Sequence, residues 1–203
     1  MIKKLVLAVV LLFSISTFSF SQDMDVKNCD IIVWRPQAFL LVPDVYIPSI
    51  IPEFMCDNID KLWYHVDLVI DKDGLLMTST PKHGAGATST IDSRLSGTWI
   101  SFMILRNDTA DCNEVLDRAY SLEGAYDWTG YYLHVLDLCF SCSKLTFFRD
   151  LPREIFEYHC ASFVFTATEI VDNPNVATPF DVVNDIKNGT ITDWKIVQET
   201  DLE

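Results

Sequence analysis

The sequence predicts one α+β domain, in which an antiparallel sheet packs against a helix that carries a cysteine. Two patterns predict this class: short apolar runs separated by turn residues fill the first half of the chain, and after Thr109 apolar residues recur at helical spacing. A third observation concerns organisation, because no internal repeat, low-complexity tract or Gly/Ser linker divides the chain. A single domain is therefore expected.

The first 22 residues have the pattern of a secretory signal peptide. Lys3 and Lys4 precede an apolar run at residues 5–13, which is too short to cross a bilayer, and small residues precede Gln22. We expect residues 1–22 to be removed and residues 23–203 to form the folded domain. The protein is then secreted or periplasmic, with no stable membrane insertion.

The charge balance excludes several kinds of partner. The chain carries 15 Lys and Arg against 29 Asp and Glu, a formal net charge of −14, and loss of Lys3 and Lys4 with the signal peptide makes it −16. Nucleic-acid binding takes most of its affinity from basic groups that neutralise phosphates, so no nucleic-acid partner is expected. Anionic membrane surfaces are disfavoured for the same reason.

The apolar runs predict strands at residues 29–34, 62–70, 75–80 and 97–105. The second and third of these form the clearest hairpin, because Asp71-Lys-Asp-Gly74 supplies a turn sequence between them. Residues 35–57 hold four prolines and are expected to form an irregular crossing loop that brings Cys56 near Cys29. Residues 81–89 are expected to form a Gly/Ala loop.

Helical spacing predicts helices at residues 112–122 and 158–171, with a capped short helix at 178–186 and a final strand at 194–197. The first helix has Asp111 or Asn113 as a plausible N-cap and Gly124 as a stop signal. Residues 128–138 have a mixed pattern that is compatible with another helix. Strands followed by helices predict α+β.

Six cysteines follow the predicted signal peptide, at positions 29, 56, 112, 139, 142 and 160. An exported protein can hold them as three disulfides, whereas a catalytic thiol leaves one other cysteine unpaired, and the count leaves both possibilities open. Cys139 and Cys142 have the spacing of half a zinc site, but no second pair at ligand spacing accompanies them. We therefore expect neither a metal nor a cofactor.

Cys160 lies where a polar and aromatic stretch changes into an apolar segment with helical spacing. A helix N-terminus and a neighbouring imidazole both lower the pKa of a thiol, and the thiolate is the attacking species. His65 is the candidate base because a predicted strand holds it rigidly, whereas His159 is expected to point away from Cys160, His134 to lie in the core and His83 in a loop. A disulfide partner and an inert core thiol are the alternatives for Cys160.

The hairpin also predicts a group that orients His65. If the turn is centred on residues 72–73, paired positions add up to 145 and Thr80 lies opposite His65, whereas a turn centred one residue later moves the partner to Lys82. Even-numbered residues of the second strand share the face of His65. Thr80 and Thr78 are therefore the candidates to fix the tautomer of the imidazole.

Several short segments, in this order, resemble the circularly permuted NlpC-type papain-like cysteine peptidases and amidases. They are Asp-Ile-Ile-Val at 30–33, Tyr-His-Val-Asp-Leu-Val-Ile at 64–70, Gly-Ala-Tyr-Asp-Trp at 124–128, Tyr-His-Cys-Ala-Ser-Phe-Val at 158–164 and Thr-Pro-Phe-Asp at 178–181. In that family the histidine strand precedes the cysteine helix. The order and spacing carry the resemblance, which covers about residues 29–190.

The resemblance implies a permuted papain-like fold with Cys160 as nucleophile, His65 as base and a polar third residue, here Thr80 or Thr78. The residues that it and the pattern around them place at the substrate cleft are Tyr64, Thr78, Tyr126, Asp127 and Tyr158. The chain departs from the family's motifs at four places, because Cys29 and Asp67 replace glycines, Tyr64 replaces a serine, and Ala161-Ser162 replaces Ser-Glu.

The expected function is that of a secreted cysteine hydrolase, which cleaves an amide bond of peptide or cell-wall type through an acyl-enzyme. Its substrate is then a peptide-, cell-wall- or lipid-derived amide or ester. One alternative is a catalytically inactive secreted binding module on the same fold. Another is a lipid acyl hydrolase or transferase, although the chain has no basic or amphipathic membrane-seeking stretch.

Overall fold

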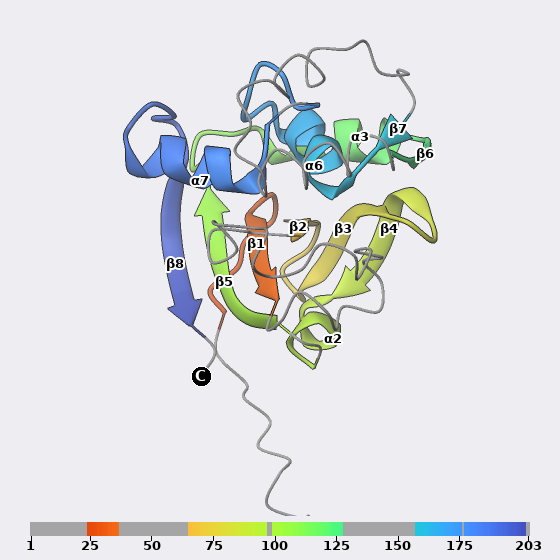
Figure 1. The fold of residues 1–203 in the computed structure, drawn as a ribbon, viewed down its shortest axis with the longest axis horizontal. Coiled ribbons are helices and arrows are strands. Elements are labelled where there is room, and N and C mark those ends of the chain that lie inside the picture. The colour runs from red at the N-terminus through yellow and green to blue at the C-terminus, as the bar shows by residue number, and fades with distance from the viewer. Residues whose placement is uncertain (1–23, 37–64, 97–98, 128–156, 176, 202–203) are drawn as a thin grey trace, which may run out of the picture.

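The computed structural model describes residues 24–36, 65–96, 99–127, 157–175 and 177–201. These residues form a six-stranded antiparallel sheet with helices packed on it, which confirms a mixed α+β class. In Figure 1 the helices α3, α6 and α7 lie together on one side, and α2 lies apart from them at the opposite end of the sheet.

The sheet consists of β1 (Ile31–Pro36), β2 (His65–Val69), β3 (Leu75–Thr80), β4 (Gly84–Thr90), β5 (Trp99–Arg106) and β8 (Lys195–Asp201). Their order across the sheet is β4-β3-β2-β1-β5-β8, and each neighbouring pair is antiparallel. Two short strands, β6 (Ala125–Tyr126) and β7 (Glu157–Tyr158), form a separate parallel pair. The described helices are α2 (Ile91–Leu95), α3 (Cys112–Ser121), α6 (Cys160–Thr168) and α7 (Pro179–Lys187).

β1 lies inside the sheet and is buried on both faces. Val33 packs with Val66 in the cluster that also contains residues of α3, α6 and α7. Trp34 packs with Phe102 in a second cluster, against which Ile91 of α2 also packs. Burial on both faces explains why β1 reads as a continuous apolar run rather than an alternating one.

The predicted hairpin is confirmed, and so is its register. Leu68 pairs with Met77 and Val69 with Leu76, so paired positions add up to 145. Gly74 has a φ of +84°, which a glycine adopts without steric cost at the end of the turn. The helices predicted at 112–122, 158–171 and 178–186 are also present, with Asp111 and Thr178 as the N-caps of α3 and α7.

The loop predicted at residues 81–89 is wrong, because most of it belongs to β4, which pairs with β3 along its length. Glycine and alanine hide the strand pattern there. A Cβ atom on Gly84 would lie 2.2 Å from the carbonyl oxygen of Gly124, and Ala85 N donates to the same oxygen. Glycine at position 84 therefore permits a close approach of two backbones. In the sequence alone, the same glycine suggests a loop.

Cys29 and Cys112 form a disulfide with a Cα–Cα distance of 5.6 Å. The bond joins the residues before β1 to the first residue of α3. Cys29 is thus not available to Cys56, the neighbour suggested by the predicted crossing loop. Cys56, Cys139 and Cys142 lie outside the described residues, as do the predicted signal peptide and His134.

Asp30 and Arg106 join the ends of β1 and β5 inside the protein. Arg106 donates through Nε and Nη2 to the two carboxylate oxygens of Asp30, at 2.9 and 2.7 Å. Asp30 is 1% exposed. The polar residue of the Asp-Ile-Ile-Val segment therefore has a structural ion-pair role. Within the described ranges, no helix has the length and apolar character needed to cross a membrane.

Candidate active site

Cys160 is the first residue of α6 and carries a thiol that is not part of a disulfide. His159 caps this helix: its Nδ1 accepts from Ser162 N, and Ser162 Oγ accepts from His159 N. The reciprocal bonds fix where the helix starts, so they also fix the position of Cys160. His159 is thus a capping residue, while the apolar residues that follow are buried against the sheet.

His65 is the first residue of β2, and its ring contacts the side chains of residues from other parts of the fold as well as from its own strand. Its Nε2 lies 2.9 Å from Asp67 Oδ1, and the thiol of Cys160 is a further side-chain hydrogen-bond partner of the ring. Since Nε2 faces Asp67, Nδ1 is the nitrogen that remains for the thiol. The structure therefore brings together Cys160 and His65, the two residues that the sequence pairs as nucleophile and base.

The net effect of this environment is a raised pKa for His65. Burial alone lowers the pKa of the imidazole, and the positive charge of Arg94 lowers it further. The negative charge of Asp67 and the hydrogen bonds with Asp67 and Cys160 outweigh both effects. The protonated form of the ring is therefore stabilised, and this is the form that can pair with a thiolate.

Asp67 is fully buried on the same strand as His65, and its carboxylate is held by three donors. Trp34 Nε1 donates to Oδ2 at 2.7 Å, Arg94 Nε to Oδ2 at 2.9 Å and Arg94 Nη2 to Oδ1 at 3.0 Å. Burial alone raises the pKa of this carboxyl group, but the charges of His65 and Arg94 and their hydrogen bonds hold it below its usual range. Asp67 is therefore ionised beside the imidazole.

The residue that orients His65 is Asp67 rather than Thr80 or Thr78. Thr78 is 1% exposed, and its Oγ1 donates to the carbonyl oxygen of Val66 at 2.7 Å, which ties β3 to β2. Thr80 Oγ1 accepts from the backbone N–H of His83 in the turn before β4. The two threonines thus stabilise the sheet and a turn, although the register used to choose them is correct.

Three of the predicted cleft residues lie on neighbouring backbone segments. β6 pairs with β7, so Tyr126 lies beside Tyr158, and Asp127 N donates to the carbonyl oxygen of Tyr158 at 3.2 Å. Tyr126 and Asp127 are buried, while Tyr158 is half-buried and packs edge-on against Phe163. The pair of strands leads directly into Cys160. Tyr64 lies outside the described residues.

The sequence contained one signal that pointed to Asp67. Residues two apart on a strand share a face, so Asp67 lies on the side of His65, and an acidic residue within an apolar strand requires a partner. Arg94 gave no such signal, because α2 has only five residues and follows a strand that reads as a loop. Among the described residues, no group of His, Cys, Asp or Glu side chains is arranged to hold a metal ion.

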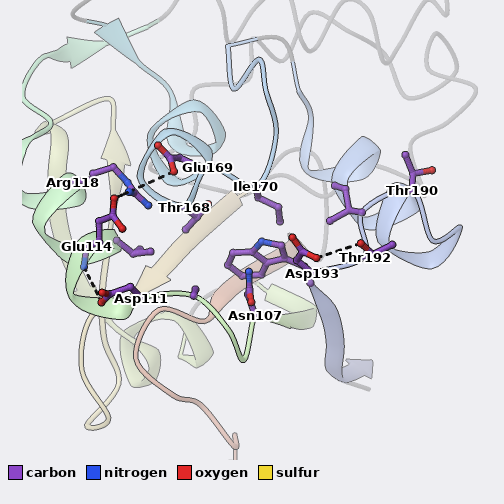
Figure 2. Close-up of a pocket in the computed structure, with 14 residues that line it drawn as sticks. Asn107, Asp111, Glu114, Arg118, Thr168, Glu169, Ile170, Thr190, Thr192 and Asp193 are labelled. Carbon is purple, nitrogen blue, oxygen red and sulfur yellow. Dashed lines mark hydrogen bonds and ion pairs between the residues drawn. The ribbon is translucent and has the colours of Figure 1, made fainter.

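A hollow of about 430 Å³ lies at the other end of α6. Figure 2 shows Arg118 of α3 at its wall, with one hydrogen bond to Glu114 and a longer ion pair with Glu169. Its lining includes Thr168, the last residue of α6, but not Cys160, from which the length of the helix separates it by about 12 Å. The hollow is therefore distinct from the candidate active site.

Comparison of the chain with protein-family models, with curated proteins and with solved structures finds no match. A functional interpretation therefore depends on the contacts among Cys160, His65, Asp67 and Arg94, together with the resemblance of short segments.

Proposed function

We propose that this protein is a secreted papain-like thiol hydrolase in which Cys160, His65 and Asp67 cleave an amide bond of peptide or cell-wall type. One observation carries the proposal: a thiol at a helix start bonds to an imidazole whose Nε2 lies 2.9 Å from a buried carboxylate. A nucleophile, a base and a group that orients the base, in contact in this order, are the parts that such catalysis needs.

In the first half-reaction, the thiolate of Cys160 lies beside a His65 ring that carries a proton on each nitrogen, and its sulfur attacks the carbonyl carbon of the substrate. The electrons of the carbonyl π bond move onto oxygen, and a backbone N–H at the start of α6 donates to this oxyanion, because first-turn amides have no acceptor within their own helix. The C–N bond then breaks as His65 protonates the leaving amine. The products are an amine and an S-acyl enzyme.

In the second half-reaction, His65 removes a proton from water and the resulting hydroxide attacks the thioester carbon. The C–S bond breaks, a carboxylic acid leaves, and the proton on His65 again faces the sulfur. Asp67 stays ionised in both halves. Its role is to fix the ring by contact with Nε2 and to stabilise the positive charge that the ring carries between proton transfers.

The resemblance to NlpC-type enzymes supports an amide substrate. Cys29 stands where that family has glycine, and its φ of +67° is a conformation that glycine adopts freely. Tyr126-Asp127 lies beside the segment that leads into Cys160, as the order of the family's motifs suggests. Secretion is proposed from the signal-peptide pattern of residues 1–22 alone.

The first test is the rate of iodoacetamide alkylation of Cys160 against pH, followed by peptide mass spectrometry. We expect fast labelling with an apparent pKa below the ordinary value of about 8.5, and a profile that moves upward in His65→Ala. His83→Ala is the matched control, because His83 is exposed in the turn before β4, and its profile should equal that of the unaltered protein. Slow labelling at every pH would contradict the proposal and favour a binding module.

The second test is turnover. Peptides, cell-wall fragments and lipid esters are offered to the protein and to Cys160→Ala, and the released amines or acids are measured. We expect amide hydrolysis that Cys160→Ala abolishes without lowering the thermal midpoint by more than a few degrees. Hydrolysis of lipid esters alone would replace the amidase by the acyl hydrolase, and activity that survives in Cys160→Ala would exclude both.

A further inference from the structure

Arg94 contacts both members of the His65–Asp67 pair from α2. Its guanidinium holds Asp67 in a two-pronged ion pair, with Nε 2.9 Å from Oδ2 and Nη2 3.0 Å from Oδ1. The same Nη2 lies 2.8 Å from His65 Nε2. In the described part of the chain, the side-chain hydrogen bonds of Arg94 all go to these two residues. Arg94 is therefore built into the candidate site.

The two contacts at His65 Nε2 require opposite protonation states. A guanidinium group only donates, so the contact with Arg94 is a hydrogen bond only when Nε2 has no proton. An ionised carboxylate only accepts, so the contact with Asp67 is a hydrogen bond only when Nε2 carries a proton. Because one nitrogen cannot do both, Arg94 binds a ring whose Nε2 has no proton, and Asp67 binds a ring whose Nε2 carries one.

Asp67 does not depend on His65 for its hydrogen bonds. Its carboxylate already accepts from Trp34 and twice from Arg94, so no buried negative charge loses its donors while the imidazole is neutral. The neutral ring with an unprotonated Nε2 is thus stabilised by the hydrogen bond that Arg94 donates to this nitrogen. Its proton must then be on Nδ1, the nitrogen that faces Cys160.

We propose that Arg94 is a positioning residue of the free enzyme, where it holds neutral His65 with its proton on Nδ1, toward Cys160, and that it gives up Nε2 to Asp67 when the ring is protonated and in the acyl-enzyme. The inference rests on the proposed function, in which Cys160 is the nucleophile. With the proton on Nδ1, the ring donates to sulfur, and sulfur accepts best as the thiolate. Arg94 thereby favours the attacking form of Cys160 through a contact on the far side of the imidazole.

The groups that face His65 come from three elements. Asp67 lies on its own strand, Arg94 comes from α2 and Cys160 from α6. Asp67 and Arg94 have opposite effects on the proton affinity of the ring, so their removal should move it in opposite directions. A merely structural role for Arg94 predicts no such difference of sign.

The experiment is nitrogen-15 NMR of the His65 ring, which reports both the pKa and the tautomer of the neutral form. It compares the unaltered protein with Arg94→Met, with Arg94→Lys and with Lys187→Met, a control that removes an exposed positive charge. We expect Nδ1–H in the neutral ring of the unaltered protein. Arg94→Met should move this proton to Nε2 and raise the proton affinity about tenfold, whereas Arg94→Lys, which keeps the charge, should shift it less.

A neutral ring with its proton on Nε2 in the unaltered protein would overturn the proposal, even if Arg94→Met did not fold. An unchanged tautomer and proton affinity in a folded Arg94→Met would overturn it as well. The same spectra are recorded in Cys160→Ser, in which no thiol chemistry is possible. If the proposed hydrolase function is wrong, Cys160 should be alkylated slowly. If the proposed role of Arg94 is wrong, the His65 spectra should show it both with Cys160 and with Cys160→Ser.

Discussion

At the scale of single residues, Asp67 supplies the negative charge that raises the pKa of His65. Asp67→Asn keeps the size of the side chain and one acceptor oxygen but removes that charge. We expect the proton affinity of His65 to fall about tenfold or more, since an opposite charge in contact shifts a pKa by about one to three units. The alkylation profile of Cys160 should move upward in pH.

The control for this change is Asp117→Asn, because Asp117 is an exposed acid on α3. It removes the same charge from the molecule without touching the site, so it should leave the profile in place. Equal profiles for the two variants would mean that Asp67 has only a structural role.

His65 should also make stability depend on pH. Its pKa is raised above the value of about 6.5 in an unfolded chain, so its stabilisation is fully present below pH 6.5 and is lost as pH rises through the folded pKa. We expect urea unfolding to show a larger free-energy difference between Cys160→Ser and Cys160→Ser/His65→Gln at pH 5.5 than at pH 9. His83→Gln in the same background should show no such change, and a difference that grew with pH would contradict the raised pKa.

The chemistry of single residues could be predicted only in part from the sequence. Cys160 and His65 were paired as candidates from a helix start and a strand, both of which are local patterns, and the structure brings the two side chains together. The orienting group was placed across the hairpin at Thr80 or Thr78, although the next residue on the same face of the strand is Asp67. Arg94 could not be found, because its role depends on where a short helix packs rather than on any periodicity.

At the scale of elements, the cap of α6 links stability to reactivity. Ser162→Ala removes the hydroxyl that accepts from His159 N, and we expect it to lower the free energy of unfolding by about 1 kcal/mol. Because that cap positions Cys160, alkylation should slow as well. Thr178→Ala breaks the matching capping box of α7 and should cost about the same stability, but leave alkylation unchanged. If Ser162→Ala and Thr178→Ala slowed alkylation equally, the cause would be a general loss of stability rather than the position of Cys160.

The disulfide gives a second prediction at this scale. It closes a loop with a sequence separation of 83, for which chain entropy predicts about 4.5 kcal/mol of stability. Cys29→Ser/Cys112→Ser should lose an amount of this order in chemical denaturation. Cys29→Gly/Cys112→Ser should lose about 1 kcal/mol less, because glycine relieves the positive φ at position 29. A glycine variant no more stable than the serine variant would contradict this account of the backbone.

The elements themselves were predicted best where their pattern is local. The hairpin register followed from its turn, and the caps of α3 and α7 followed from Asp111 and Thr178. β4 was missed because Gly84 serves a contact with Gly124 that is distant in the sequence. The pairing of Cys29 with Cys112 could not be predicted for the same reason. It depends on how the start of β1 and the start of α3 pack in the fold, and the two are 83 residues apart in the sequence.

At the scale of the whole molecule, the net charge of −14 opposes the compact state through self-repulsion. We expect added sodium chloride to raise the thermal midpoint at pH 8, because screening weakens this repulsion. Near pH 4.5, where the sequence is isoelectric, the same salt should raise it much less. Calorimetry at the two pH values checks this, and equal shifts would point to an effect of salt other than screening.

The disulfide and the thiol also set opposite redox requirements on one protein. In the proposed function, Cys160 attacks a carbonyl only when reduced, whereas Cys29 and Cys112 support the fold only when oxidised. A thiol reductant that restores an oxidised Cys160 acts by attack on sulfur, which is also the reaction that opens the Cys29–Cys112 bond. Activity should therefore pass through an optimum as reductant increases, with a width that depends on how well the burial of Cys29 protects its sulfur.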